Sequence, residues 1–226
     1  AGEAAAGADG GVPDLVGLAG SAADAVGGVV GEEGRADAAG VGWGGKDCAT
    51  ITTFENLLRQ NDIAALILEP LVLGAGGMKM YSAETLKQLY DLCQQHNVLF
   101  IADEVMTGFG RTGTMFACEQ AGITPDLLCL SKGLSGGFLP IGATLAREDI
   151  YQAFYNDERG KMFFHSSSFT GNPLSCAAAV AALEIWEEEP VLERIQTIAK
   201  AHQAAATRFA AHENARDIRQ CGTILA

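Results

Sequence analysis

The sequence predicts an α/β fold built on a mostly parallel sheet flanked by helices. Two short apolar runs, residues 98–102 and 127–130, have the length and composition of buried strands. A third apolar run, residues 63–68, is followed by a helical pattern before the 98–102 run begins. Strand, helix and strand at this spacing form a βαβ unit, whose strands pair in parallel through a right-handed crossover.

The helix of this unit is expected from Ser82, a favourable N-cap residue, to about residue 96. Its apolar residues fall on one face: Leu86, Leu89, Tyr90 and Cys93. Pro70 stops the strand that precedes it, since proline cannot donate to a strand ladder. The other expected elements are helices at 53–60, 148–155, 174–186 and 191–212, a strand at 141–145, and a strand within 217–226 that starts another layer.

Composition excludes several classes of protein. The net charge of −13 disfavours nucleic acid as a partner, because phosphates would repel the chain. No apolar run reaches the length of a membrane span, and the beginning of the chain has no secretory signal pattern. The six scattered cysteines are typical of reduced, mostly buried thiols in a cytoplasmic protein, and the four histidines lack metal-ligand spacing, so we expect no metal site.

Both central strands end next to a charged residue. Asp103 follows the 98–102 run and Lys132 follows the 127–130 run, at the edge where open α/β sheets bind ligands. A lysine amine forms a Schiff base with an aldehyde cofactor, and a carboxylate keeps the ring nitrogen of pyridoxal phosphate protonated. On these two residues alone, a strand-end cap and a solvated lysine remain the simpler interpretation.

The surrounding motifs favour the cofactor chemistry. ADEVMTGFGRTG at 102–113 and PDLLCLSKGLSGGFLP at 125–140 resemble the class III aminotransferases, which have pyridoxal phosphate fold type I. The resemblance covers residues 50–226 and implies a large-domain portion of that fold with a truncated C-terminal domain. It divides the chain into a Gly/Ala-rich segment of uncertain order (1–47), a partial cofactor-binding domain (48–213) and the start of a small domain (214–226).

The resemblance also implies roles for individual residues. Lys132 links to the cofactor and, once released by the substrate, moves the proton. Asp103 pairs with the ring nitrogen, and Val105 packs on the ring face, which is compatible with plain core packing. Met106 stands where many members have a glutamine that contacts the ring hydroxyl, so that contact is lost.

The cofactor phosphate is expected to contact a different segment. HSSSFTGNP at 165–173 resembles a family segment whose hydroxyl residue before the phenylalanine binds the phosphate across a dimer interface. Ser168 holds that position, with Thr170 as a substitute, so a homodimer is implied. Residues 20–25 weakly match the family's other phosphate-binding helix start, but chance explains that match better in so Gly/Ala-rich a segment.

The glycine loop at 108–113 fits the pattern of a dinucleotide fingerprint but not its context. Five residues separate it from the preceding strand, and no acid-tipped strand follows at the required distance. We therefore expect the glycines to let the loop turn tightly, with Arg111 as a structural residue.

One position bears on the small-molecule substrates. The ornithine and γ-aminobutyrate members have a gating glutamate where this chain has Ala75, and GAGGMKMY at 74–81 is most similar to the branch that serves biotin biosynthesis with S-adenosylmethionine as amino donor. Two alternatives stay open. The chain is another class III ω-amino-acid aminotransferase, or it is a non-catalytic fragment of such an enzyme.

Overall fold

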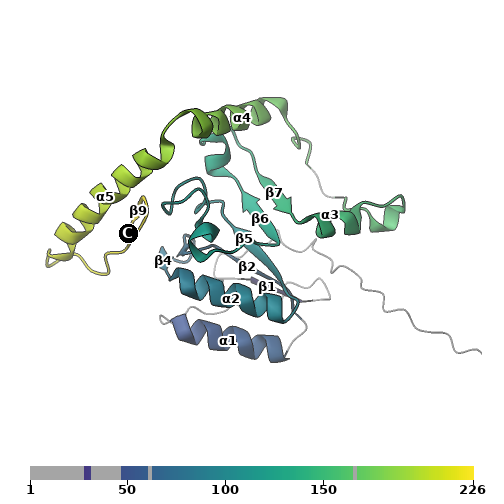
Figure 1. The fold of residues 1–226 in the computed structure, drawn as a ribbon, viewed down its shortest axis with the longest axis horizontal. Coiled ribbons are helices and arrows are strands. Elements are labelled where there is room, and N and C mark those ends of the chain that lie inside the picture. Colours follow the sequence, from purple (N-terminus) through teal and green to yellow (C-terminus); the bar gives the residue numbers. More distant parts are fainter. Residues whose placement is uncertain (1–27, 32–46, 61–62, 165–166) are drawn as a thin grey trace, which may run out of the picture.

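The computed structural model describes residues 28–31, 47–60, 63–164 and 167–226 (Figure 1). The α-helices are α1 (Asp47–Gln60), α2 (Ala83–Gln95), α3 (Glu148–Phe154), α4 (Pro173–Glu188) and α5 (Val191–Ala210). The strands are β1 (Gly28–Gly31), β2 (Ile63–Leu68), β3 (Val72–Leu73), β4 (Lys79–Met80), β5 (Leu99–Asp103), β6 (Leu127–Leu130), β7 (Ala143–Ala146), β8 (Gln220–Cys221) and β9 (Ile224–Leu225). Short 3₁₀ helices are η2 (Ala117–Ala121), η3 (Lys132–Ser135) and η4 (Arg159–Lys161).

The main sheet has the order β1-β2-β5-β6-β7. Its three central strands are parallel, as the βαβ pattern predicts, and the two outer strands pair antiparallel. The α/β class and the parallel core are therefore confirmed.

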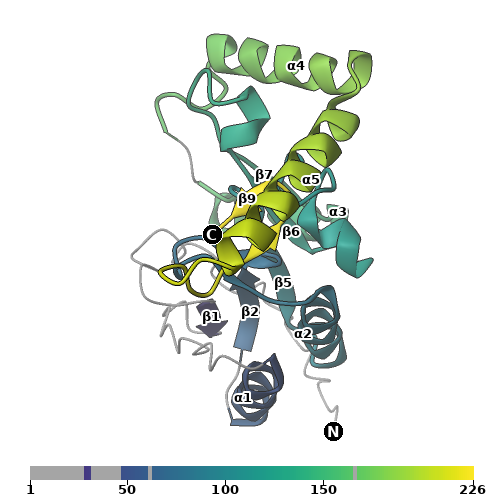
Figure 2. The same cartoon turned by 90° about the vertical axis from the view of Figure 1, so that its left-hand side faces the viewer.

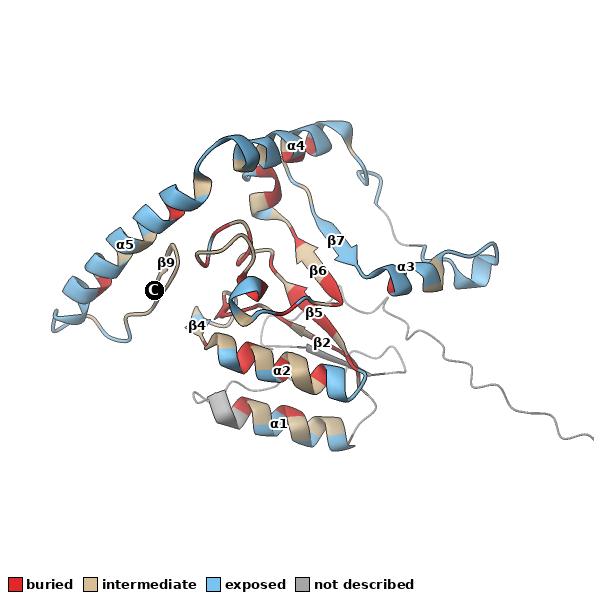
Figure 3. Cartoon of the chain, in the orientation of Figure 1, coloured by how far each residue is buried: buried red, intermediate tan, exposed pale blue. Residues whose placement is uncertain are grey.

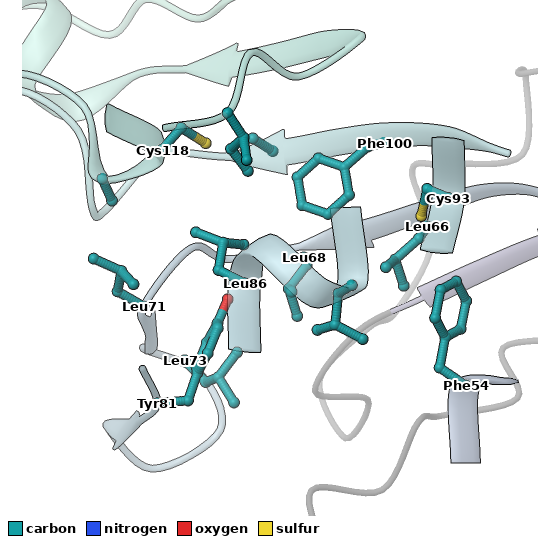
Figure 4. Close-up of a cluster of buried hydrophobic side chains, with 14 of the residues drawn as sticks. Phe54, Leu66, Leu68, Leu71, Leu73, Tyr81, Leu86, Cys93, Phe100 and Cys118 are labelled. Carbon is teal, nitrogen blue, oxygen red and sulfur yellow. The ribbon is translucent and has the colours of Figure 1, made fainter. Parts of the chain in front are cut away.

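Helices α1 and α2 cover one face of this sheet (Figure 1). Phe54 from α1 and Leu86 from α2 meet Leu66, Leu68 and Phe100 from the strands in one buried cluster (Figure 4). Burying a leucine or phenylalanine side chain contributes about 1.5–3 kcal/mol, so this cluster is the main source of stability among the described residues. Ser82 caps α2 as expected, because its Oγ accepts the Thr85 N–H at 3.1 Å.

The opposite face carries a smaller cluster. Ala65, Ile101 and Leu127 from the central strands pack there against Ile150 of α3, with Cys129 at its margin. Side chains alternate along a strand, so the next residues on this face are Glu69 after Ile67 and Asp103 after Ile101. This face, which carries the smaller apolar cluster among the described residues, thus receives two carboxylates at its carboxyl edge.

Several boundaries differ from the prediction. Helix α1 begins at Asp47 rather than near residue 53, and β1 was not predicted within the Gly/Ala-rich segment. The end of the chain is a hairpin, β8–β9, rather than a single strand. Gly222, at φ +55°, supplies the left-handed conformation that this turn needs.

The hairpin lies beside α5 (Figures 1 and 2) and contacts loops at the edge of the sheet. The Thr223 N–H donates to the Arg111 carbonyl at 2.9 Å, and the Arg219 guanidinium donates to the carbonyls of Gly77 and Met78. A Cβ on Gly222 would lie 2.3 Å from the Thr112 carbonyl carbon, so the close approach requires glycine.

Much of the chain after β6 is exposed (Figure 3). Large apolar side chains on this side are open to solvent, among them Phe138, Phe164, Phe169 and Leu174. No helix in the described ranges is both long and apolar enough to cross a membrane.

The described cysteines only partly match the prediction. Cys93 and Cys118 are buried, Cys129 and Cys221 are half-buried, and Cys176 is exposed, all as free thiols. Burial raises the pKa of the Cys93 and Cys118 thiols well above the usual range, so both remain protonated and unreactive.

Asp126, the residue before β6, hydrogen-bonds to groups from three other parts of the chain. Its carboxylate accepts the Phe100 N–H of β5 at 2.7 Å, the Gln94 amide of α2 and the Arg147 guanidinium that precedes α3. Its side chain is 2% exposed, so losing these bonds leaves a buried donor without a partner.

We expect Asp126→Ala to lower the free energy of unfolding by about 2–4 kcal/mol, as measured by urea denaturation. The matched control is Asp149→Ala, which removes the other carboxylate that binds Arg147, at a side chain 63% exposed. That variant should unfold close to the wild-type midpoint because solvent already screens the pair. Equal losses in both variants would contradict the structural role of Asp126.

Candidate functional site at the carboxyl edge of the sheet

Strands β2, β5 and β6 end side by side. Leu68 pairs with Ala102, and Asp103 pairs with Cys129, so the residues after β2 and β6 flank Asp103. Glu69 follows β2 directly, and Lys132 follows β6 after Ser131. The parallel register therefore gathers an amine and two carboxylates at one edge.

The two adjacent acids at the end of β5, Asp103 and Glu104, have different environments. Glu104 is fully buried, and its carboxylate accepts the N–H of Ala117, the N–H of Cys118 and the Thr107 hydroxyl at 2.8–3.1 Å. It holds the start of η2 and has little capacity for a ligand. Asp103 is half-buried on the other face, and its Oδ1 accepts the Val105 N–H at 3.1 Å. Of the two acids, Asp103 is the one available for binding.

Lys132 begins η3 with an unusual backbone. Its φ is +41°, in the left-handed region that non-glycine residues rarely adopt, and its side chain is exposed. Such strain persists only where the surroundings enforce it, and it often marks a functional position. Ser131 braces the turn by donating its hydroxyl to the Ile141 carbonyl at 2.6 Å.

The glycine next to Lys132 allows η3 to approach the 108–113 loop. A Cβ on Gly133 would lie 2.6–2.8 Å from the side chain of Phe109. That loop is itself closely packed, since a Cβ on Gly110 would lie 2.0 Å from Ile195 of α5. The glycines thus serve close packing, and the backbone of Arg111 binds the C-terminal hairpin, which agrees with the structural reading of this loop.

We call the charged residues at this edge, Glu69, Asp103 and Lys132, the strand-end cluster. The sequence motifs did not single out Glu69 as a site residue. Its carboxylate accepts the backbone N–H of Gly74, and its carbonyl accepts the Tyr81 hydroxyl at 2.7 Å. Partial burial raises the pKa of Glu69 and the charge of Asp103 raises it further, while the Gly74 and Ala75 amides and the Lys132 charge lower it. The sequence feature that could have identified Glu69 is an acidic residue directly after an apolar strand, which is also the feature that identifies Asp103.

Val105 and Met106 border the cluster. Both are half-buried just beyond Asp103. A Cβ on Gly74 would lie 2.5 Å from the Met106 sulfur and 3.3 Å from the Glu69 carboxylate, so both side chains approach the same side of Gly74.

Ser168 lies in an exposed turn before α4, apart from the cluster. The turn is held by its own groups: the Ser167 N–H donates to the Thr170 hydroxyl at 2.9 Å, and the Phe169 N–H donates to the Ser167 hydroxyl. Among the described residues, no hydrogen bond joins Ser168 to Asp103 or Lys132. Residues 165–166, and residues 20–25 with the other possible phosphate segment, lie outside the described ranges.

The chemistry of the cluster fits pyridoxal phosphate better than a metal ion. The exposed amine of Lys132 can react with the aldehyde of the cofactor, and the half-buried carboxylate of Asp103 can pair with its basic ring nitrogen. Within the described ranges, no group of three or more His, Cys, Asp or Glu side chains is arranged to hold a metal.

Comparison with known proteins shows similarity over most of the chain. The aminotransferase class-III family model matches residues 43–226. An adenosylmethionine-8-amino-7-oxononanoate aminotransferase of Geobacter sulfurreducens is 44% identical over 185 residues, which cover 80% of this chain and 40% of the relative. The enzyme of that name from Helicobacter pylori is 55% identical over 134 residues, covering 59% of this chain and 31% of the relative.

Solved structures give the same result. The adenosylmethionine-8-amino-7-oxononanoate aminotransferase of Methanocaldococcus jannaschii has a TM-score of 0.72 at 38% identity, over 79% of this chain and 42% of that one. An (S)-enantioselective omega-transaminase of Thermomicrobium roseum has a TM-score of 0.73 at 28% identity, over 79% of this chain and 40% of that one. The chain thus spans less than half the length of these relatives.

The family model matches more than half of the chain, and the solved structures share its fold. The chain belongs to the class III aminotransferase family.

Proposed function

We propose that the chain is the central part of a pyridoxal-phosphate aminotransferase, with Lys132 and Asp103 holding the cofactor. The observation that carries this proposal is the parallel register that sets an exposed lysine beside a half-buried aspartate at the carboxyl edge. When bound, pyridoxal phosphate supplies an electron-withdrawing ring that stabilises negative charge on the substrate carbon.

The chain's own residues have distinct tasks in this proposal. The Asp103 carboxylate, oriented by the Val105 N–H, pairs with the ring nitrogen and keeps its proton there. The Lys132 amine would condense with the aldehyde of the cofactor, with loss of water, and, when free, would carry the proton on its Nζ. Val105 packs on the ring face, and the Met106 thioether borders the same site without a hydrogen-bond donor for the ring oxygen.

The proposed assembly is a cytoplasmic homodimer that binds no nucleic acid and no membrane. The apolar side chains exposed around the Ser168 turn, including Phe164, Phe169 and Leu174, support burial against a second subunit. In such a dimer Ser168 donates its hydroxyl to the phosphate of the cofactor, with Thr170 beside it. The free thiols support a reducing compartment.

For substrates we propose the small molecules of biotin biosynthesis. S-adenosylmethionine donates the amino group and 8-amino-7-oxononanoate accepts it, as the names of relatives 44–55% identical to this chain indicate for those proteins. Ala75 supports this choice, because it lacks the carboxylate that gates the ornithine and γ-aminobutyrate enzymes.

The second candidate is an ω-amino-acid aminotransferase. The fold match to the omega-transaminase of Thermomicrobium roseum favours it. The same cofactor site would serve both reactions, so only the amino donor separates them.

Cofactor binding tests the central proposal. The chain mixed with pyridoxal phosphate should develop a visible absorbance band, and borohydride should fix the cofactor mass on the peptide that contains Lys132. Lys132→Ala should lose both signals, whereas Lys200→Ala, a control on the exposed face of α5, should keep them. A fixed label on another lysine, or no band in the wild-type chain, would overturn the proposal.

Amino-donor use tests the substrate. Conversion of the bound cofactor to its amine form, followed by absorbance, should proceed with S-adenosylmethionine and not with β-alanine. Conversion with β-alanine alone would establish the ω-amino-acid reaction instead. Conversion with neither donor, in a chain that binds the cofactor, would indicate a binding fragment without transferase activity.

A further inference from the structure

Phe109 contacts the turn that carries Lys132, and the proposed chemistry gives Phe109 no task. A Cβ on Gly133 would lie 2.6 Å from the Cβ of Phe109 and 2.7–2.8 Å from two atoms of its ring. Gly133 lies outside the left-handed region, so lack of space rather than backbone conformation requires glycine there. The nearest atom is the Cβ of Phe109, so turning the ring would not make room. Phe109 and the start of η3 are therefore in direct van der Waals contact.

The backbone is unusual on both sides of this contact. Lys132 has a φ of +41° and Phe109 has a φ of +54°, two left-handed conformations that residues with a side chain rarely adopt. Such conformations persist only where the surrounding structure fixes them. Because the two segments pack against each other, the contact is one of the restraints that keep Lys132 in its conformation.

The ring of Phe109 is supported by a buried cluster. It meets the ring of Phe116 edge to face, with ring centroids 5.7 Å apart. Both rings pack against a cluster made of Leu130, Leu134 and Ala179, which come from β6, η3 and α4. The ring thus contacts the base of the η3 turn as well as its first residues.

The 108–113 loop is anchored on its far side by the C-terminal segment. A Cβ on Gly110 would lie 2.0 Å from a side chain of α5. The Arg111 carbonyl accepts the N–H and the hydroxyl of Thr223 in the β8–β9 hairpin, at 2.9 and 3.1 Å. The loop is therefore packed between the C-terminal segment and the turn to Lys132, which gives Phe109 a fixed base.

We propose that Phe109 is a positioning residue for Lys132: its side chain, packed against Gly133, holds the η3 turn so that the amine starts from one fixed direction. The task of the amine rests on the proposed function, whereas the packing belongs to the chain without cofactor. Phe109 acts through Lys132 and requires no contact with cofactor or substrate. Fixing the direction of a reacting group raises its rate, because less entropy is lost in reaching the transition state.

The first test measures amide hydrogen exchange in the cofactor-free chain by mass spectrometry. The η3 turn is closed by hydrogen bonds from the amides of Leu134, Gly136 and Gly137. Phe109→Ala should speed exchange of these amides about five- to thirtyfold, because the turn opens more readily without the ring. Exchange in α2 should stay the same. Phe109→Tyr, which keeps the ring, should exchange like the wild type.

The control is Phe209→Ala, the same substitution at a side chain 48% exposed near the end of α5. Exchange in η3 should stay at the wild-type rate in this variant. Two results in Phe109→Ala would overturn the proposal. Unchanged exchange in η3 would mean that the ring does not restrain the turn, and equally faster exchange in α2 and η3 would mean that it supports the whole fold.

The second test keeps Phe109 and changes the other side of the contact. Gly133→Ala should speed exchange in η3, because the new Cβ collides with Phe109. Gly160→Ala is the matched control, since a Cβ there meets no atom within 4 Å. On a Phe109→Gly background, Gly133→Ala should add no further acceleration, because the collision partner is gone. Equal exchange in Gly133→Ala and Gly160→Ala would refute the contact, whether or not Phe109→Ala folds.

The rate at which pyridoxal phosphate links to Lys132 tests the positioning itself. At saturating cofactor, Phe109→Ala should slow the growth of the visible band about tenfold or more, since the amine loses its fixed direction. The cofactor concentration that gives half the maximal rate should stay near the wild-type value, because Asp103 is unchanged. Phe109→Tyr should restore the rate. A smaller folded fraction would lower the final absorbance and leave the rate constant as it is.

The outcomes separate this inference from the proposed function. Faster exchange confined to η3 in Phe109→Ala, in a chain that links no pyridoxal phosphate, would support the packing against η3 and reject the cofactor. Linkage at the wild-type rate in Phe109→Ala would overturn the positioning role and leave the cofactor site intact.

Discussion

In a parallel sheet, neighbouring strands finish at the same edge, and the register of β2, β5 and β6 is the constraint on which this site depends. It sets Glu69, Asp103 and the turn to Lys132 next to one another although they lie far apart in the sequence. An antiparallel pairing would have sent Lys132 to the opposite edge from Asp103. The crossover helix α2 supports the parallel pairing of β2 with β5, because its buried face completes the largest apolar cluster on the sheet. The parallel pairing of β5 with β6 is connected by residues 104–126, which contain η2.

The two faces of the sheet have different tasks. Helices α1 and α2 bury one face, and Glu104 and Asp126 anchor the backbone there through donors on η2 and β5. Among the described residues, α3 packs on the other face, and Asp103 at its edge is half-buried. The face under α1 and α2 therefore stabilises the fold, and Glu104 is buried there. The other face is the one with a residue available for binding, Asp103.

The sequence predicted the parts of the fold that local pattern controls. Strands β2 and β6, helix α2 with its Ser82 cap, and the parallel βαβ unit follow from apolar periodicity and capping. It missed β1, whose Gly-rich sequence carries no periodic signal and is held by backbone pairing with β2. It also read β8–β9 as one strand, since the turn depends on how closely Gly222 approaches the backbone of Thr112.

For the candidate site, residue type and strand ends indicated Asp103 and Lys132, and family resemblance added Val105 and Ser168. Sequence alone did not single out Glu69 at this edge, because its position beside Asp103 arises from strand register and its carboxylate is bound by the hairpin that follows β2. Nor could it distinguish the environments of Asp103 and Glu104, which are adjacent in sequence but face opposite sides of the sheet.

The most direct test of the account is the protonation state of the cofactor's ring nitrogen in the bound chain. With ¹⁵N-labelled pyridoxal phosphate, NMR should give the shift of a protonated nitrogen in the wild-type chain and in Asp157→Asn, a control in an exposed loop. Asp103→Asn should give the shift of an unprotonated nitrogen, because the paired carboxylate is gone. A protonated nitrogen in Asp103→Asn would contradict the assignment of that residue and the edge geometry built on it.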